Sequence, residues 1–271
     1  MREMFLSLRR RLLHRLLAPL LAEQAEHQRR FIADAAHQLR TPLAGLQSQV
    51  EAWAQAARRI VPPGGSGSLL VPVDQVDKLR NATRRTTQLA NQLLALSRAE
   101  ARTTSDHPME PVDLRALAGS VLETYLDRAA ARRIDLGMAL EGDGPEPARA
   151  WGQEWLLREL LANLVDNAIK YTPEGGTITI GGGLRPGGPA WLSVEDDGPG
   201  VPEALLPRLL DRFYRVPGST GEGTGLGLAI VDEIARVHRG RLLLGAGAEG
   251  RGLRVVMEWP GSRAPLASAE P

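Results

Sequence analysis

The stretch Phe31-Ile-Ala-Asp-Ala-Ala-His-Gln-Leu-Arg-Thr-Pro-Leu-Ala-Gly-Leu46 decides how the first half of this chain folds. Apolar residues that begin within it alternate steps of four and three, the 3.5-residue repeat of helices packing side by side: Ile32, Ala36, Leu39, Leu43, Leu46, Val50, Trp53, Ala57 and Ile60. His37 follows the seam position Ala36, so its imidazole is expected to turn out of the core toward solvent. The pattern alone leaves this histidine open as a nucleophile, a metal ligand or a residue without a chemical role.

A strong turn signal separates this helix from a second one. Residues 62–68 read Pro-Pro-Gly-Gly-Ser-Gly-Ser, and a further amphipathic helix is predicted over residues 73–101. Two long helices joined by a short loop form an antiparallel hairpin. One hairpin cannot bury both of its apolar seams, whereas two hairpins can do so as a four-helix bundle. We therefore predict a homodimer through residues 31–101.

Composition limits the classes of function. The chain has 271 residues, enough for two domains, and its 43% hydrophobic and 24% charged residues are typical of a globular protein. A net charge of +1 gives no bulk electrostatic reason to expect a nucleic-acid partner. The absence of cysteine excludes disulfides, thiol catalysis and thiolate metal sites, and it fits a reducing compartment. We expect a cytoplasmic location, with the inner face of the plasma membrane as the alternative.

Residues 1–30 combine leucines and arginines in a basic amphipathic pattern. The longest uncharged apolar run there, residues 16–22, is far shorter than the roughly 20 residues that span a bilayer. Two interpretations stay open. The segment lies on an anionic membrane surface, or it continues a dimer helix or is the remnant of a removed upstream region. The second is favoured, because leucines at helical spacing more often belong to a core.

The second half of the chain predicts a domain of mixed type. A polar, proline-bounded linker is expected at residues 102–111, the domain at residues 112–260, and a disordered tail at residues 261–271. The predicted helices cover residues 114–133, 153–171 and 226–238, and the predicted strands cover residues 134–140, 177–182, 190–195, 241–245 and 253–259. With strands 177–182 and 190–195 as a hairpin, the prediction is an α+β fold with helices on one face of a mixed sheet.

The predicted helix at 153–171 has a polar side as well as a core stripe. Glu159, Asn163, Asn167 and Lys170 are spaced by 4, 4 and 3 residues, so they stack along one side. Asparagine is a poor helix former, so two asparagines here need a reason. Either this side is solvated, or the amide oxygens coordinate a hard cation such as Mg²⁺ and leave Lys170 for a phosphate.

Two glycine-rich stretches follow in the sequence. The first, Asp196-Asp-Gly-Pro-Gly200, ends a predicted strand, where a carboxylate can accept hydrogen bonds from an exocyclic amine and glycines let a flat ligand approach. The second, Gly223-Thr-Gly-Leu-Gly227, leads into a helix whose free N–H groups form an anion site. It is not a Walker A loop, because no Gly-Lys-Ser/Thr ends it. Each stretch alone is a weak signal.

In order and spacing these motifs resemble those of the sensor histidine kinases of two-component signalling, over about residues 30–260. The matching segments are His37-Gln-Leu-Arg-Thr-Pro-Leu43, Asn163-Leu-Val-Asp-Asn-Ala-Ile-Lys-Tyr171, the stretch 196–200, Asp211-Arg-Phe-Tyr-Arg215 and Gly223-Thr-Gly-Leu-Gly-Leu228. Five segments in family order across two domains are hard to obtain by chance. The resemblance implies a dimeric histidine-phosphotransfer hairpin, then a Bergerat-type ATP-binding two-layer α/β sandwich, and hence an ATP-dependent protein-histidine kinase.

The resemblance also implies roles for individual residues. His37 is the phosphoacceptor, which passes its phosphoryl group to an aspartate of a response-regulator receiver domain. Asn167 holds Mg²⁺ beside Asn163, and Asp196 binds the adenine amino group, with residues 199–224 as a lid over ATP. The other positions expected to contact the nucleotide are Lys170, Tyr171, Gly198, Gly200, Phe213, Arg215, Gly223, Thr224, Gly225, Leu226 and Gly227.

Gln38 departs from the family pattern, and with Thr41 and Glu159 it completes the candidate catalytic residues. Many members carry Glu or Asp after the histidine, whereas glutamine can hydrogen-bond but cannot accept a proton. Thr41 matches the position with which the family places water when it dephosphorylates its partner, so a kinase that is also a phosphatase is a hypothesis. The alternative is a degenerate kinase that acts as an ATP-binding scaffold or receiver phosphatase.

Overall fold

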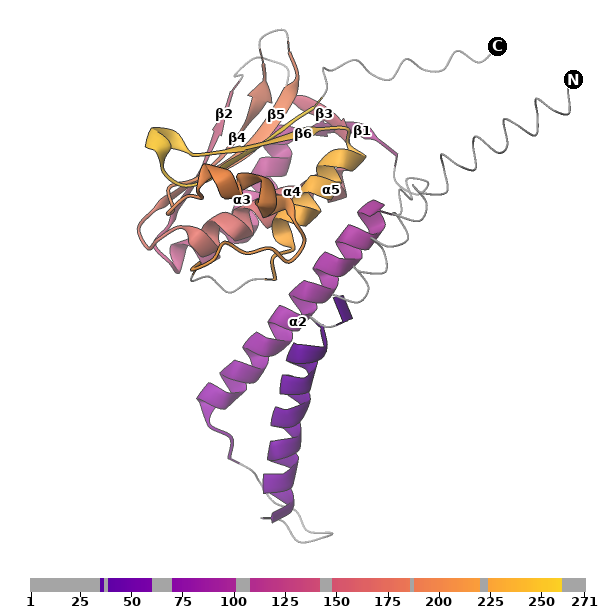
Figure 1. Cartoon of the computed structure of the whole chain (residues 1–271), viewed down its shortest axis with the longest axis vertical. Coiled ribbons are helices and arrows are strands. Elements are labelled where there is room, and N and C mark those ends of the chain that lie inside the picture. The colour runs from indigo at the N-terminus through magenta and orange to yellow at the C-terminus, as the bar shows by residue number, and fades with distance from the viewer. Residues whose placement is uncertain are drawn as a thin grey trace, which may run out of the picture. The chain divides into compact units, whose positions relative to one another are not determined.

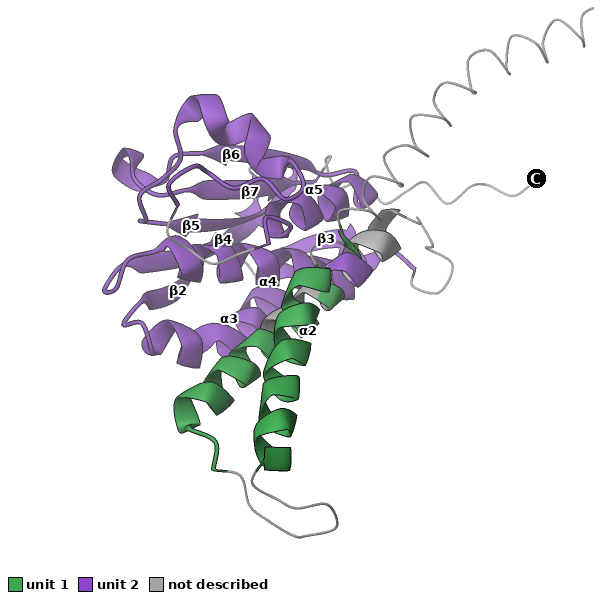
Figure 2. Ribbon diagram, turned by 60° about the horizontal axis from the view of Figure 1, so that its bottom comes forward, with its two compact units in different colours: residues 1–91 green, residues 92–271 purple. Residues whose placement is uncertain are grey.

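The computed structural model describes residues 35–36, 39–59, 70–100, 108–141, 148–185, 188–219 and 224–259. These residues belong to two compact units, 1–91 and 92–271, which Figure 2 shows in different colours. The predicted basic helix at 1–30 and the predicted tail at 261–271 lie outside the described residues, as do His37, Gln38 and Gly223.

The first unit contains the predicted helical hairpin. Residues 39–59 form its first helix, and α2 (Val73–Glu100) is the second, whose last residues belong to the other unit. Figures 1 and 2 show the two helices side by side. Trp53 Nε1 donates a hydrogen bond to Gln75 Oε1 at 2.9 Å, which joins the helices near the loop.

The hairpin buries only part of its apolar seam. Leu46 and Trp53 are half-buried, whereas Leu43 is 50% exposed and Val50 is 52% exposed. Val76 of α2 is similarly exposed. A seam that remains half open after the two helices have paired is what the sequence pattern predicted for a single hairpin.

The second unit is built on a five-stranded mixed sheet with the order β2-β4-β5-β7-β6. Its strands are β2 (Asp135–Leu140), β4 (Thr177–Leu184), β5 (Ala190–Asp196), β6 (Arg241–Gly245) and β7 (Arg254–Glu258). β2 pairs with β4 in parallel, and the other neighbours are antiparallel. The predicted hairpin of β4 and β5 is confirmed, with Ile178 opposite Asp196.

Three helices cover one face of this sheet, as Figure 1 shows: α3 (Leu114–Ala130), α4 (Glu154–Tyr171) and α5 (Gly227–Val237). Ile178, Ile180 and Leu192 of the sheet are fully buried, as are Leu157 and Leu160 of α4. Helix α4 lies between the other two and packs on both. The expected two-layer α/β arrangement is therefore confirmed, and α4 is its central helix.

Two short strands and two 3₁₀ helices were not predicted. β1 (Glu110–Asp113) pairs in antiparallel fashion with β3 (Arg149–Gly152), so the last two residues of the expected linker belong to a strand. Four residues are too few to show a period-2 pattern, which explains the omission. The 3₁₀ helices are η1 (Glu203–Leu210), with eight residues, and η2 (Ala248–Gly250), with three. No helix in the described part of the chain combines the length and apolar character needed to cross a membrane.

Candidate functional site

A cavity of about 260 Å³ in the second unit gathers most of the predicted site residues. Helix α4, the end of β5, the segment 199–219, the start of α5 and Leu253 form its walls. The predicted residues in the lining are Asn163, Asn167, Lys170, Tyr171, Asp196, Gly200, Arg215, Thr224, Gly225 and Gly227. Segments predicted separately from the sequence therefore meet around one space.

Four predicted residues lie beside the cavity rather than in its lining. Glu159 accepts a hydrogen bond from Asn163, and the Gly198 N–H donates to Asp196. The Phe213 N–H donates to the Gly225 carbonyl at 2.9 Å, and Leu226 is fully buried. The Leu226 N–H donates to Oγ1 of the lining residue Thr224 at 3.3 Å, so each of these four is hydrogen-bonded to a lining residue. Thr41 belongs to the first unit, where it is exposed on the helix at 39–59.

Asp196 is the only acidic residue where β5 meets the cavity among the described lining, and it is 8% exposed. Its Oδ1 accepts backbone hydrogen bonds from Gly198 at 2.9 Å and Leu253 at 3.3 Å. Burial raises the pKa of Asp196 above its usual value, and these two hydrogen bonds offset the effect only in part. Since both bonds reach Oδ1, Oδ2 is the oxygen available to a ligand donor. The lining of the same cavity includes the apolar residues Val201 and Leu209, which suit a flat heterocycle that carries an amine.

Two glycines are required by the backbone around this cavity. Gly252 has φ +64°, and a Cβ at this position would lie 1.6 Å from the Asp196 carbonyl oxygen. Gly225 has φ +72°, and a Cβ there would lie 2.6 Å from the Phe213 carbonyl carbon. Both combine a left-handed conformation with a close approach of two chain segments, so a side chain is excluded at either position.

The α4 wall of the cavity is polar. Asn163 Nδ2 donates to the Glu159 carbonyl at 2.8 Å and to Glu159 Oε1 at 3.0 Å. The Asn163 Oδ1 atom faces Gly227, where a Cβ atom, if one were present, would lie 3.5 Å from it. The carboxamide of Asn167 makes no hydrogen bond with another described residue, although it lines the cavity. This amide is therefore available to a ligand or an ion.

The start of α5 borders the same space. The helix begins at Gly227, which lines the cavity, and its N-cap residue Leu226 provides no side-chain hydrogen bond. The first N–H groups of a helix have no partner within the helix, so an uncapped N-terminus at a cavity favours an anion. The helix start predicted at residue 226 is confirmed to within one residue.

Asp166 is a lining residue that the sequence reasoning missed. Its buried carboxylate pairs with Lys170 of the same helix, Nζ to Oδ2 at 2.5 Å, and with Arg128 of α3. Burial alone raises the pKa of Asp166, but Lys170 and Arg128 outweigh burial and hold that pKa below its usual value. The spacing of four residues to Lys170 was the available signal.

The other lining residues missed from the sequence are mostly apolar: Pro199, Val201, Leu209, Tyr214, Val216, Pro217, Gly218, Ser219, Leu228 and Leu253. Most belong to the expected lid, which was predicted as a range without individual contacts. The Arg208 guanidinium lies 4.3 Å from the centre of the Tyr214 ring, so this part of the lid is packed by a cation–π contact. Leu253 comes from the far end of the domain, and no local sequence pattern predicts that it lines the cavity.

Two family models match the chain. The His Kinase A (phospho-acceptor) domain matches residues 27–102, and the histidine kinase-, DNA gyrase B-, and HSP90-like ATPase matches residues 152–263. The chain carries the core of a sensor histidine kinase of two-component signalling. The resemblance drawn from the five motifs is thereby confirmed, and residues 152–263 of this histidine kinase match the ATP-binding domain of the family.

Relatives and solved structures agree with this family. The sensor protein kinase PmrB of Pseudomonas aeruginosa is 36% identical over 246 residues, which cover 90% of this chain and 48% of that protein. The chain spans about half the length of the curated relatives it matches.

Two solved structures share the fold. The histidine kinase AdeS of Acinetobacter baumannii matches with a TM-score of 0.63 and 22% identity, over 84% of this chain and 98% of that one. Full-length ShkA in complex with AMPPNP matches with a TM-score of 0.57 and 27% identity, over 73% of this chain and 42% of that one. The predicted order, a helical hairpin followed by a Bergerat-type domain, is confirmed.

Proposed function

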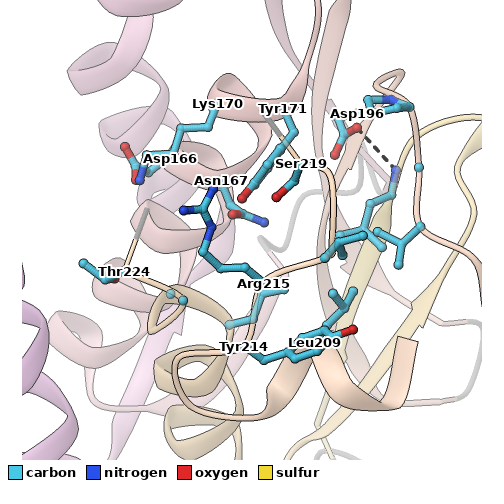
Figure 3. Close-up of a pocket in the computed structure, with 18 of the residues that line it drawn as sticks. Asp166, Asn167, Lys170, Tyr171, Asp196, Leu209, Tyr214, Arg215, Ser219 and Thr224 are labelled. Carbon is cyan, nitrogen blue, oxygen red and sulfur yellow. Dashed lines mark hydrogen bonds and ion pairs between the residues drawn. The ribbon is translucent and has the colours of Figure 1, made fainter. Parts of the chain in front are cut away.

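We propose that this histidine kinase core uses ATP to phosphorylate His37 and then passes the phosphoryl group to an aspartate in the receiver domain of a response regulator. One observation carries the proposal. The cavity has Asp196 on one side and the polar residues of α4 on the other (Figure 3), in a chain whose residues 27–102 match a phosphoacceptor domain. An ATPase of the gyrase or chaperone class has no need of such a domain.

The lining suits ATP from end to end. The adenine amine donates to Asp196 Oδ2, and its rings contact apolar residues such as Leu209. The phosphates lie toward Lys170 and the N-terminus of α5, where an ammonium group and free N–H groups favour negative charge. In support of nucleotide binding, the structure of ShkA, a 27% identical protein, was determined in complex with AMPPNP.

Mg²⁺ fits the donors at the phosphate end. The free carboxamide of Asn167 offers a hard oxygen ligand, and a magnesium ion in a nucleotide site takes most of its other ligands from phosphates and water. No group of three or more His, Cys, Asp or Glu in the described residues could hold a metal ion by itself. When bound, the ion would neutralise charge on the phosphates. Asn167 is the residue that holds it, with Asn163 beside it.

In the proposed reaction a neutral imidazole of His37 attacks the γ-phosphorus of ATP. A nitrogen–phosphorus bond forms, the bond to the β–γ bridging oxygen breaks, and ADP leaves. Phosphoryl transfer depends on in-line positioning and charge neutralisation more than on covalent assistance from the protein. Gln38 cannot accept a proton, so the proton left on the other ring nitrogen of His37 after the attack is released to water.

A homodimer is the proposed functional unit. Leu43 and Val50 lie two helical turns apart on one side of the helix at 39–59, and each is about half exposed within the hairpin. A second copy of the hairpin would cover these side chains in a four-helix bundle.

The test of the proposed reaction is incubation of the full chain with γ-labelled ATP and Mg²⁺. We expect acid-labile, base-stable label on the wild-type chain and none on His37→Ala. His107→Ala is the matched control, since it removes a histidine from the expected linker, and it should retain the label. Label that persists on His37→Ala would assign another phosphoacceptor. A wild-type chain that binds ATP but takes no label would favour the degenerate scaffold.

A phosphatase activity toward the receiver is proposed as well, because Thr41 is exposed and follows His37 by four residues in the sequence. A threonine hydroxyl in this place can orient a water molecule toward a phosphoaspartate. Thr41→Ala should slow dephosphorylation of the labelled receiver while autophosphorylation stays unchanged. Full phosphatase activity in Thr41→Ala would contradict this role.

A further inference from the structure

Asp166 is a carboxylate in the wall of a cavity that is proposed to receive a polyphosphate. Its side chain is only 6% exposed, and it lies on the same face of α4 as Asn163 and Lys170. An unpaired carboxylate in this position would repel the phosphates. The repulsion would be strong, because water screens a buried charge less than an exposed one. Its presence in the lining therefore requires another role.

Both oxygens of this carboxylate meet a cation. Oδ2 lies 2.5 Å from Lys170 Nζ, one turn further along α4, and Oδ1 pairs with Arg128 from α3. Lys170 lines the cavity with a side chain that is 24% exposed. Arg128 is outside the lining, so the order from α3 to the cavity is Arg128, Asp166, Lys170. Figure 3 shows Asp166 beside Lys170, away from Asp196.

The α3 side of this arrangement is itself held in place. The Arg128 guanidinium lies 6.0 Å from the centre of the Tyr125 ring. Tyr125 remains neutral, because burial, followed by the charge of Asp166, raises its pKa to about 12. Just after α3, Arg132 donates hydrogen bonds to the carbonyls of Ile169 and Thr172, the latter at 3.1 Å, which joins the end of α3 to the end of α4.

We propose that Asp166, clamped by Arg128, is a positioning residue that fixes the Lys170 ammonium at the phosphate end of the nucleotide site. A lysine has a flexible four-carbon side chain, and most of its rotamers would carry the ammonium away from the phosphates. An ion pair with a carboxylate that is fixed from behind selects the rotamer that lines the cavity. This inference rests on the proposed binding of ATP in this cavity.

The opposite effect of the same contacts would be sequestration, in which Asp166 neutralises Lys170 and weakens its attraction for phosphate. Positioning and sequestration predict opposite changes in the affinity for ATP when Asp166 is replaced in Asp166→Asn. That substitution removes one negative charge from the phosphate end, so charge alone predicts tighter binding of ATP. Loss of positioning predicts weaker binding despite the more positive site.

The deciding measurement is the equilibrium Kd of the full chain for Mg·ATP and for adenosine, by titration calorimetry at fixed ionic strength. We expect Asp166→Asn to raise the Kd for ATP about tenfold, within the range for a hydrogen bond to a charged group. The Kd for adenosine should stay unchanged, which also shows that the domain remains folded. An ATP Kd that is unchanged or lower in Asp166→Asn would overturn the proposal.

Two further comparisons make the test independent of one variant. Adding Asp166→Asn to Lys170→Met should weaken ATP binding no further than Lys170→Met alone, because Asp166 acts through that ammonium. Arg128→Gln, at a half-exposed position, should raise the ATP Kd about threefold, and Arg128→Lys should restore it in part. An unchanged Kd in Arg128→Gln would refute the clamp.

The matched charge control is Glu174→Gln, which breaks an exposed ion pair with Arg133 outside the cavity lining. It removes the same charge as Asp166→Asn and should leave the Kd for ATP unchanged. A wild-type chain that failed to bind ATP at all would contradict the proposed function rather than the positioning role of Asp166.

Discussion

The Nε2 atom of His238 accepts a hydrogen bond from the backbone N–H of Gln153 at 3.0 Å, which ties the end of α5 to the start of α4. The Nδ1 atom lies 2.7 Å from the Ile234 carbonyl oxygen, so Nδ1 carries the proton and the ring is neutral. His238 is the C-cap residue of α5. Gly152 leaves room for the ring, since a Cβ there would lie 2.8 Å from one of its carbons. The two helices joined in this way both contribute walls to the nucleotide cavity.

This contact predicts a pH-dependent stability. Burial lowers the pKa of His238 below its ordinary value of 6.5, and the Ile234 hydrogen bond opposes this only in part. The unfolded chain therefore binds a proton more readily than the native one, so the contribution of His238 is complete above about pH 6.5 and is lost as pH falls through the native pKa. Urea unfolding of wild type and His238→Gln between about pH 7.5 and pH 5 checks this.

The quantity to compare is the difference in unfolding free energy between wild type and His238→Gln, in which the titration of the carboxylates cancels. That difference should decrease as the pH is lowered. A difference that stays constant over the range would show that the neutral ring is not required.

Asp196 is expected to lower the stability of the domain without nucleotide and to strengthen its binding of ATP. Because burial raises its pKa, its charged form at neutral pH costs the empty domain stability, so Asp196→Asn should leave the thermal midpoint equal or higher. The same substitution removes a charged acceptor for the adenine amine and should raise the Kd for ATP about tenfold. Calorimetry and a thermal melt without nucleotide measure the two effects.

GTP provides the matched ligand for this residue. Its O6 atom is an acceptor that a carboxylate repels, whereas an amide can donate to it. The preference for ATP over GTP should therefore fall in Asp196→Asn. Unchanged affinities for both nucleotides would show that the nucleotide base does not contact Asp196.

The fold was largely predictable because its long elements carry strong periodic patterns. Helices α2, α4 and α5 and the β4–β5 hairpin begin and end within two residues of their predicted bounds. The pair β1–β3 was not predictable in the same way. Each strand has four residues, and their pairing joins segments far apart in the chain, which no local pattern encodes.

The site residues likewise divide into those that a local sequence pattern predicts and those that depend on tertiary contacts. Asn163, Asn167 and Lys170 were predicted because polar residues at helical spacing stand out against a core stripe. Asp166 belongs to the same wall, but its role depends on Arg128, which comes from another helix. Leu253 enters the lining only through the pairing of β5 with β7. A contact that depends on tertiary packing leaves no signature in the spacing of either partner.

Asn167 should control the use of Mg²⁺. Its carboxamide has no hydrogen-bond partner in the described part of the chain, so its removal breaks no internal contact there. Asn167→Ala should lower autophosphorylation between about 10- and 100-fold and raise the Mg²⁺ concentration needed for half-maximal rate. Removal of divalent cations with EDTA should abolish the reaction in wild type.

The control for this prediction is Asn81→Ala, which removes an exposed asparagine from α2 in the first unit and should leave the Mg²⁺ dependence unchanged. If Asn167→Ala keeps the wild-type rate at limiting Mg²⁺, the carboxamide does not hold the ion.

The open seam of the hairpin predicts how the dimer can be broken. Val50 is 52% exposed within one hairpin, and a second hairpin would bury it against apolar side chains. Val50→Glu would place a charge in that interface and should raise the dimer dissociation constant about 100-fold or more. Ser48→Glu adds the same charge at another exposed position, on the side of the helix away from Val50, and should keep the dimer. Sedimentation velocity at micromolar concentration separates the outcomes, and a wild-type chain that sediments only as a monomer would show that the half-exposed seam is not a dimer interface.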